Sequence, residues 1–220
     1  MTPPPEITLD MMRQAFSSAV VCDALDSEGL TRQSPRVPLR SLTVNVTLVG
    51  RCKTTLWAEM AHPDPKPYEL ELIALDGCQP DDVLIAAAAG SLRSGIWGEL
   101  LSTAARNAGC VGVIVDGAVR DVRRMRDMAF PCFARATVIY DSKDRQRVID
   151  IDIPVEIDGV RFCPGDLVIA DEDGVVVVPQ AVEAIVVQKA WEKVHAENKV
   201  RDAIAAGMKA VTAFDTFGVL

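Results

Sequence analysis

The strongest constraint on the fold is a strand–helix–strand pattern in the middle of the chain. Residues 81–90, DDVLIAAAAG, form an apolar run that ends in small residues, and residues 110–117, CVGVIVDG, form a second apolar run. Between them, a loop at 91–98 leads into the helical segment ELLSTAARNAG at 99–109. Two apolar strands joined by a helix within about 35 residues make a βαβ unit with parallel strands and a right-handed connection. The sequence therefore predicts an α/β fold.

The N-terminal part of the chain adds two helices and a long strand to this unit. Residues 8–29 are predicted to form one helix, and residues 42–60, where β-branched and polar side chains alternate, a strand. The segment YELELIALDGC at 68–78 fits a short helix. Residues 31–41 and the Pro-rich segment HPDPKP at 62–67 are predicted loops, because Pro lacks an amide donor and restricts its neighbour.

The C-terminal part is predicted to be mixed. A short helix with a basic face is expected at 119–128 and a strand at 130–142. Residues 153–179 contain short apolar runs and the turn signals Asp-Gly and Pro-Gly, which indicate antiparallel or mixed strands. A long helix follows at 181–206, and the remaining tail, GMKAVTAFDTFGVL, ends in apolar residues.

We expect one domain that covers residues 1–220. The chain has 220 residues, of which 49% are hydrophobic and 25% charged, so it can build a sizeable core. No repeat or linker divides it. Residues 181–220 are predicted to be a C-terminal helical extension at a subunit interface, because an apolar tail needs a surface to cover it.

The overall charge argues against several classes of partner. The formal net charge is −8, and an acidic chain repels phosphate backbones, so we expect no nucleic acid as a partner. No run of about 20 apolar residues is present, so no membrane span is expected. The N-terminal segment MTPPPEITLDMMRQ lacks the basic and apolar regions of a signal peptide. These observations predict a cytoplasmic protein.

The inventory of reactive side chains is narrow. Six cysteines are far apart in the sequence with no CxxC pair, which favours buried free thiols over disulfides or a zinc site. The chain has only two histidines, so His-based metal sites and Ser–His or Cys–His nucleophiles have little to build on. Acid–base or metal chemistry must therefore depend on carboxylates and arginine.

The two parallel strands of the βαβ unit predict where such chemistry would lie. Ligands in open α/β folds bind at the carboxyl ends of strands. The first strand leads to Glu99 at the helix start, and the second leads to Arg120 and Asp121, so these three side chains should approach one another at one edge of the sheet. The helix start also offers the unpaired amides of residues 98–101 (Gly98, Glu99, Leu100 and Leu101), which can hold a small carboxylate.

An edge with two carboxylates, one guanidinium and no histidine suits a hard divalent cation such as Mg²⁺ that keeps several of its waters. A guanidinium beside the cation could stabilise a developing enolate oxygen, which points to metal-assisted chemistry on a small keto acid. Each residue also has a purely structural explanation. Glu99 is favourable next to a helix dipole, Arg120 and Asp121 could be a solvated surface pair, and Asp116 is typical of a turn. The bulky Trp97 is expected to pack.

The same residues resemble the RraA-like family, which includes class II pyruvate aldolases that act on 4-hydroxy-4-methyl-2-oxoglutarate and 4-carboxy-4-hydroxy-2-oxoadipate. The resemblance covers most of the chain. It includes the segments VCDALDSEGL, WGELLSTAARNAGCVGVIVDGAVRDV, PVEIDGVRFCPGDLVIADEDGVVVVP and AENKVRDAIAAGM. The family's aldolase signature is an acid, twenty intervening residues and Arg-Asp, which corresponds here to Glu99, residues 100–119 and Arg120-Asp121.

The resemblance implies a fold, an activity and a role for each matched residue. The fold would be a layered, swivelling β/β/α domain assembled as a trimer or hexamer with sites at subunit interfaces. Asp121 would bind a divalent cation directly, with Mg²⁺ preferred and Mn²⁺ or Co²⁺ as alternatives, and Glu99 would bind it through water. Arg120 would contact the keto oxygen of pyruvate, and the backbone of residues 98–101 its carboxylate.

The implied reaction is metal-dependent cleavage of a 4-hydroxy-2-oxo acid to pyruvate and a second keto acid, with oxaloacetate decarboxylation as a close variant. The characterised aldolases usually carry Asp where this chain has Glu99, one methylene longer. The alternative is a non-catalytic, RraA-like regulator that binds a ribonuclease or another protein. Family members named as ribonuclease regulators lack the final Asp of the signature, so Asp121 favours the enzyme.

Overall fold

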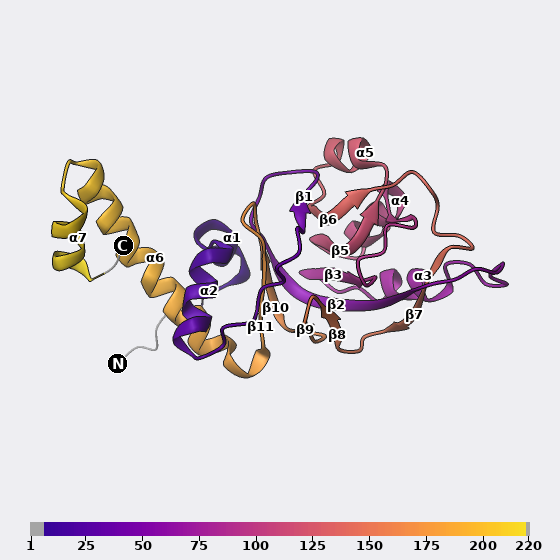
Figure 1. Cartoon of the computed structure of the whole chain (residues 1–220), viewed down its shortest axis with the longest axis horizontal. Coiled ribbons are helices and arrows are strands. Elements are labelled where there is room, and N and C mark those ends of the chain that lie inside the picture. The colour runs from indigo at the N-terminus through magenta and orange to yellow at the C-terminus, as the bar shows by residue number, and fades with distance from the viewer. Residues whose placement is uncertain (1–6, 219–220) are drawn as a thin grey trace.

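The computed structural model describes residues 7–218, which fold as a sheet of nine strands with helices on one face and a small hairpin on the other. A helical arm extends away from this body, as Figure 1 shows. The fold class predicted from the sequence, a layered α/β domain with a central βαβ unit and a C-terminal helix, is confirmed.

The strands of the main sheet run in the order β1-β6-β5-β3-β2-β10-β11, while β4 pairs with β5 and β7 pairs with β2. A separate two-stranded sheet contains β8 and β9. The strands are β1 (Arg40–Ser41), β2 (Leu48–Glu59), β3 (Asp82–Ala87), β4 (Gly95–Trp97), β5 (Gly112–Val119), β6 (Cys132–Thr137), β7 (Gln146–Ile151), β8 (Val155–Ile157), β9 (Val160–Phe162), β10 (Leu167–Ala170) and β11 (Val175–Val178).

The helices occupy three regions of the chain. Two are N-terminal, three connect the strands in the middle of the chain, and two form the C-terminal arm. They are α1 (Leu9–Ala15), α2 (Ser18–Ser27), α3 (Glu69–Asp76), α4 (Glu99–Asn107), α5 (Val122–Asp127), α6 (Glu183–Ala205) and α7 (Ala210–Phe217). None of the helices in the described range is both long and apolar enough to cross a membrane.

The predicted βαβ unit forms the centre of the sheet. Strands β3 and β5 are parallel neighbours, with Ile85 opposite Ile114, and α4 connects them. Strand β6 continues the parallel arrangement on the other side of β5. The carboxyl ends of β4 and β5 therefore reach the same edge of the sheet, because β4 also pairs with β5 in parallel.

Strands β3 and β5 are apolar along their whole length because both faces of the sheet are covered. On one face Leu84 and Val113 pack with residues of α3, α4 and α5. On the other face Ile85 and Ile114 pack with the β8–β9 hairpin, including Phe162. Hairpin, sheet and helices are the three layers of the predicted β/β/α arrangement.

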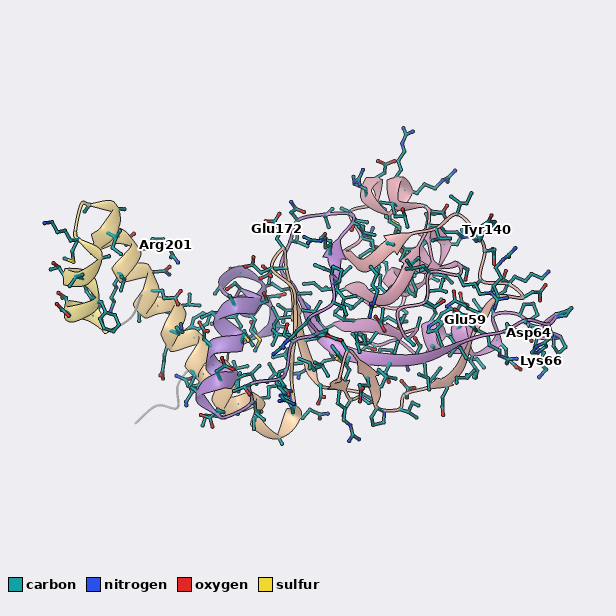
Figure 2. The ribbon with its side chains drawn as sticks, in the orientation of Figure 1. Glu59, Asp64, Lys66, Tyr140, Glu172 and Arg201 are labelled. Carbon is teal, nitrogen blue, oxygen red and sulfur yellow. The ribbon has the colours of Figure 1, made fainter. Side chains whose placement is uncertain are left out.

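A third cluster joins the arm to the body. Phe16 of the N-terminal region and Val186 and Ala190 of α6 pack against Leu167 and Ile169 of β10 and against β11. Beyond this contact, α6 and α7 extend away from the sheet (Figure 1). Figure 2 shows Arg201 on this arm, at the opposite end of the molecule from Tyr140.

Several predicted boundaries were wrong. The single helix expected at 8–29 is two helices, because Phe16 is extended and the Ser17 side chain caps α2 by accepting a hydrogen bond from the Val20 amide. The strand expected at 42–60 begins only at Leu48, and the one expected at 130–142 ends at Thr137.

Three further elements differ from the prediction. The loop expected at 91–98 contains strand β4, and residues 146–151 form strand β7, which the sequence pattern did not reveal. The C-terminal tail contains α7, separated from α6 by a short turn. The apolar end of the tail, residues 219–220, lies outside the described residues. All six cysteines are free thiols, four of them buried, as predicted.

Candidate functional site

The carboxyl ends of β4 and β5 border a cavity of about 330 Å³. Its walls combine apolar side chains with three carboxyl groups, one guanidinium and one phenol. The lining residues are Tyr68, Glu71, Leu72, Gly95, Ile96, Trp97, Gly98, Leu100, Leu101, Arg120, Asp121, Asp141 and Ser142. The structure thus brings Gly98, Leu100, Leu101, Arg120 and Asp121 of the predicted site to one cavity.

The closest approach within the predicted site is between Gly98 and Asp121. A Cβ atom placed on Gly98 would lie 2.7 Å from Oδ2 of Asp121 and 3.4 Å from Cγ of Arg120. The glycine therefore leaves room for the Asp121 carboxylate, which any side chain at position 98 would displace. The two strand ends are held in register by the Arg120 amide, which donates to the Trp97 carbonyl at 2.8 Å.

The backbone at the start of α4 carries free donors. Gly98 is the N-cap residue, and it has no side chain to cap the helix amides that follow. Trp97 is fully buried, and its indole Nε1 donates to Ser102 Oγ at 2.8 Å, which in turn donates to the Gly98 carbonyl at 2.9 Å. The predicted packing role of Trp97 is confirmed. These contacts fix the helix end and leave its first amides available to an anion at the cavity.

Asp121 occupies the left-handed region, with φ 57°, at the N-cap of α5. Short polar side chains such as Asp tolerate this conformation better than others. Its carboxylate does not cap α5 and instead lies against Gly98. The residue after β5 is thus shaped to present an exposed carboxylate to the cavity.

Asp141 connects two cavity residues. Its Oδ2 accepts from Arg120 Nη2 at 2.6 Å, and its Oδ1 accepts from the Tyr68 hydroxyl at 2.8 Å and from the Lys143 amide at 2.8 Å. Partial burial acts to raise the pKa of Asp141, but these hydrogen bonds and the charge of Arg120 outweigh it and lower the pKa. Burial and the bond to Asp141 raise the pKa of Tyr68 to about 12. Arg120 therefore has a fixed position, with other N–H groups left for a ligand.

Glu71 is the most unusual residue of the cavity. It lies in the first turn of α3 and is 6% exposed. Burial raises the pKa of its carboxyl group to about 8, and the negative charge of Asp141 contributes while Arg120 opposes. No described residue shares a hydrogen bond with this group, although it lines the cavity. Burial thus favours the protonated form of Glu71.

Glu99 is placed differently from the prediction. It begins α4, but its Oε1 accepts from the Thr103 hydroxyl one turn along the same helix, at 3.3 Å, and Glu99 does not line the cavity. The chain segments of Glu99 and Asp121 meet, as expected, through Gly98 rather than through the Glu99 carboxylate. Rotation of the Glu99 side chain would be needed to bring it to a shared cation.

Asp116 is not a turn residue. It lies within β5, is 1% exposed, and its Oδ1 accepts from Arg135 Nε of β6 at 2.5 Å. Its Oδ2 accepts from the Gly90 amide at 3.1 Å. The pairing of β5 with β6 shifts register at this point. The Asp-Gly pair therefore marks an irregularity inside a buried strand, and the strand continues to Val119.

The residues present fit a hard divalent cation. Asp121 offers an exposed carboxylate, Gly98 leaves space beside it, and the nearby donors are oxygen atoms. Within residues 7–218, no cluster of three or more His, Cys, Asp or Glu side chains could hold a metal. A cation here would therefore have one or two protein carboxylates and would keep several waters, which is typical of Mg²⁺.

We predict that Gly98→Ala changes the site and not the fold. The added methyl would displace the flexible Asp121 carboxylate, so Mg²⁺ affinity should fall about 10- to 100-fold while the melting temperature stays near the wild-type value. Calorimetric Mg²⁺ titration and thermal unfolding measure the two effects. Gly174→Ala is the matched control, because nothing lies within 4 Å of a Cβ at Gly174. Unchanged Mg²⁺ binding by Gly98→Ala would contradict the proposed location of the cation.

Sequence reasoning missed Tyr68, Glu71 and Asp141. The signal for Glu71 was its spacing, because α3 buries Glu71, Ala74 and Leu75 at i, i+3 and i+4. A carboxyl group on the buried face of a helix is a candidate for function. Asp141 and Tyr68 lie in segments between elements, and no local pattern indicates that they meet.

Comparison with known proteins identifies the family. The RraA-like family model, described as Aldolase/RraA, matches residues 18–177. A protein of Halalkalibacterium halodurans named "Putative 4-hydroxy-4-methyl-2-oxoglutarate aldolase" is 33% identical over 210 residues, which cover 95% of this chain and 94% of that protein.

Two solved structures share the fold over nearly the whole chain. An uncharacterized protein from Pseudomonas syringae has a TM-score of 0.84 and 26% identity, covering 99% of this chain and all of that one. Streptomyces coelicolor RraAS2 is described as an unusual member of the RNase ES inhibitor RraA protein family. It has a TM-score of 0.78 and 29% identity, and the match covers 91% of this chain and 98% of that one.

Proposed function

Because the chain belongs to the Aldolase/RraA family, we propose that it is a lyase, a divalent-metal-dependent aldolase. Its substrate would be a 4-hydroxy-2-oxo acid of the 4-hydroxy-4-methyl-2-oxoglutarate type, and its products pyruvate and a second keto acid. Decarboxylation of oxaloacetate would be a side activity, because it passes through the same pyruvate enolate.

The residues of the predicted site have the following roles in this proposal. The amides at residues 98–101 bind the C1 carboxylate of the substrate, helped by the dipole of α4. Arg120, held by Asp141, donates a hydrogen bond to the C2 keto oxygen and stabilises negative charge there as the C3–C4 bond breaks. Asp121 would hold the cation, and Glu99 would bind it through water once its side chain turned away from Thr103. When bound, the cation acts as a Lewis acid that polarises the keto group.

The observation that carries the proposal is the meeting of three features at one 330 Å³ cavity. These are the uncapped start of α4, the fixed guanidinium of Arg120 and the exposed carboxylate of Asp121. Apolar side chains, including Ile96 and Leu101, also line the cavity, beside the place where the enolate would develop.

The test is pyruvate release from 4-hydroxy-4-methyl-2-oxoglutarate and from oxaloacetate, measured with Mg²⁺, with EDTA, and with Mn²⁺ or Co²⁺ added back. We expect EDTA to abolish release and Mg²⁺ to restore it. Turnover that persists in EDTA would exclude the metal-dependent mechanism, and no pyruvate from either substrate would exclude the activity.

The alternative is a non-catalytic regulator of a ribonuclease, which the likeness to the Streptomyces protein favours. Retention of Asp121 beside an open cavity supports the enzyme instead. An inhibition assay separates the enzyme from the regulator. If the chain is a regulator, wild type and the Asp121→Ala variant should inhibit a ribonuclease equally well. The six free cysteines support a reducing compartment, and we place the protein in the cytoplasm.

We further propose that the protein is a homo-oligomer, a trimer or hexamer, in which the helical arm of residues 183–217 contacts a neighbouring copy. The arm exposes Val211, Phe214 and Phe217. It also has a groove of about 450 Å³ near Val200 and Ile204. Exposed apolar side chains of this kind are typical of an interface.

The predicted result is that the double variant Val211→Glu/Phe214→Glu weakens assembly roughly 100-fold, because two charges would be buried at the interface. Light scattering over a range of concentrations measures it. Val46→Glu, an exposed position away from the arm, is the control. Identical masses for the double variant and wild type would exclude the arm from the interface.

A further inference from the structure

Glu71 has no structural partner to account for its burial. It is 6% exposed, yet no described residue donates a hydrogen bond to its carboxyl group or accepts one from it. No described side-chain oxygen is both sealed from solvent and without a partner, so the carboxyl oxygens of Glu71 keep their contact with solvent through the cavity that the residue lines. A carboxyl group kept in this condition at the wall of a cavity is a candidate for contact with a ligand in that cavity.

The position of Glu71 relative to the proposed site is defined by its neighbours. Four other titratable groups line the same cavity. Tyr68 precedes it in the same segment, Arg120 and Asp121 come from the end of β5, and Asp141 comes from the segment after β6. The charge of Arg120 acts on Glu71 directly. Glu71 therefore lies within electrostatic range of the Arg120–Asp141 pair, and all three residues line the cavity.

We propose that Glu71 is the acid that protonates the C3 carbon of the pyruvate enolate after cleavage. This inference rests on the proposed function. The other carboxyl groups of the cavity are less suited to it, because Asp141 is occupied by Arg120 and Tyr68 and Asp121 is the carboxylate proposed to hold the cation.

The step balances without a further reactant. The C4 hydroxyl proton leaves to solvent, the C3–C4 bond breaks, and its electron pair forms the enolate of pyruvate. The O–H bond of Glu71 then breaks as the C3–H bond forms, which leaves pyruvate and the Glu71 carboxylate. Solvent returns a proton to Glu71. In the reverse direction, the carboxylate removes a proton from the methyl group of pyruvate.

The reverse step gives a direct assay. Pyruvate is incubated with enzyme and Mg²⁺ in D₂O, and loss of the methyl proton signal is followed by NMR. We expect Glu71→Gln to slow this exchange about 100-fold or more, the usual contribution of a general acid or base. Glu69→Gln, in the same helical turn but exposed and paired with Lys66, is the matched control and should exchange like wild type.

Two further measurements separate catalysis from structure. In wild type, the cleavage rate should fall as pH rises through the Glu71 pKa of about 8, and this fall should be absent in Glu71→Gln. Carbon-13 labelling of glutamate δ-carbons in the metal-free protein should show one signal that titrates near pH 8 and is missing from Glu71→Gln. Glu71→Asp should recover part of the exchange, because it restores an acid.

The outcomes are distinguishable from failure of the proposed function. Exchange by Glu71→Gln at the wild-type rate, while wild type cleaves the substrate, would overturn the role of Glu71 and leave the aldolase intact. A Glu71 signal that titrates near pH 4.5, the ordinary value for a glutamate, would also overturn it. Absence of both cleavage and exchange in wild type would overturn the aldolase and this inference together.

Discussion

Asp121→Asn is expected to abolish Mg²⁺-dependent pyruvate release, with a loss of at least about 100-fold in kcat/KM. The substitution removes the charge that would hold the cation and preserves the size of the side chain. It should also preserve the fold, because Asn tolerates the left-handed conformation that residue 121 adopts, with φ 57°. Steady-state kinetics, Mg²⁺ titration and thermal unfolding measure the three quantities.

The control for Asp121→Asn is Asp127→Asn, an exposed acid at the end of the same short helix α5. Asp127→Asn removes the same charge from the same region. It therefore tests whether the loss of activity in Asp121→Asn comes from Asp121 itself or from a change in the net charge at this edge of the sheet. We expect wild-type activity and Mg²⁺ affinity for this variant. Undiminished cleavage by Asp121→Asn would show that the cation, if required, binds elsewhere.

The part of the site that could be predicted from the sequence is the part defined by strand ends. Gly98 lies at the start of the helix of the βαβ unit and Arg120 and Asp121 follow its second strand, and the parallel neighbours β4 and β5 end at the same edge. The rotamer of Glu99 could not be predicted in the same way. Its side chain has a local partner, Thr103, and a local hydrogen bond competes with any contact across the cavity.

Tyr68 and Asp141 could not be located from the sequence, because their proximity depends on tertiary packing. The Tyr68 hydroxyl and the Asp141 carboxylate lie 73 positions apart in the sequence. The hydrophobic pattern of α3 was also misleading, since Leu72 and Ile73 are exposed and Glu71 is buried. A helix that buries glutamate and exposes leucine beside a cavity is typical of a functional site. Predictions from hydrophobic periodicity fail at such positions.

The fold shows the same division between local and distant causes. The apolar runs of β3 and β5 and the Gly-terminated helix between them have local signals, and they were predicted. The break between α1 and α2 is partly set by Asp171, whose carboxylate accepts from the Ser18 amide and hydroxyl across 153 positions. Strand β7, QRVIDI, is six residues long, of which only three are apolar, and its identity as a strand depends on pairing with distant β2.

Asp116, in an Asp-Gly pair that is typical of a turn, forms a buried ion pair instead. Its side chain is 2% exposed and that of Arg135 is 25% exposed. Gly117, next in sequence, would bring a Cβ within 3.0 Å of the Ser91 carbonyl. The irregularity in β5 thus places a charge inside the sheet, where Arg135 and the Gly90 amide neutralise it and tie the loop after β3 to the strand.

Arg135→Met is expected to destabilise the fold by about 3 kcal/mol, because it leaves the Asp116 carboxylate buried without its countercharge. Urea unfolding at neutral pH measures the change. The double variant Asp116→Asn/Arg135→Met should be less destabilised by about 1 kcal/mol or more, since the buried charge is gone and the amide oxygen introduced at position 116 can still accept from the Gly90 amide. If both variants unfold at the same urea concentration, an unpaired buried charge is not the cause, and the loss reflects packing of the Arg135 side chain alone.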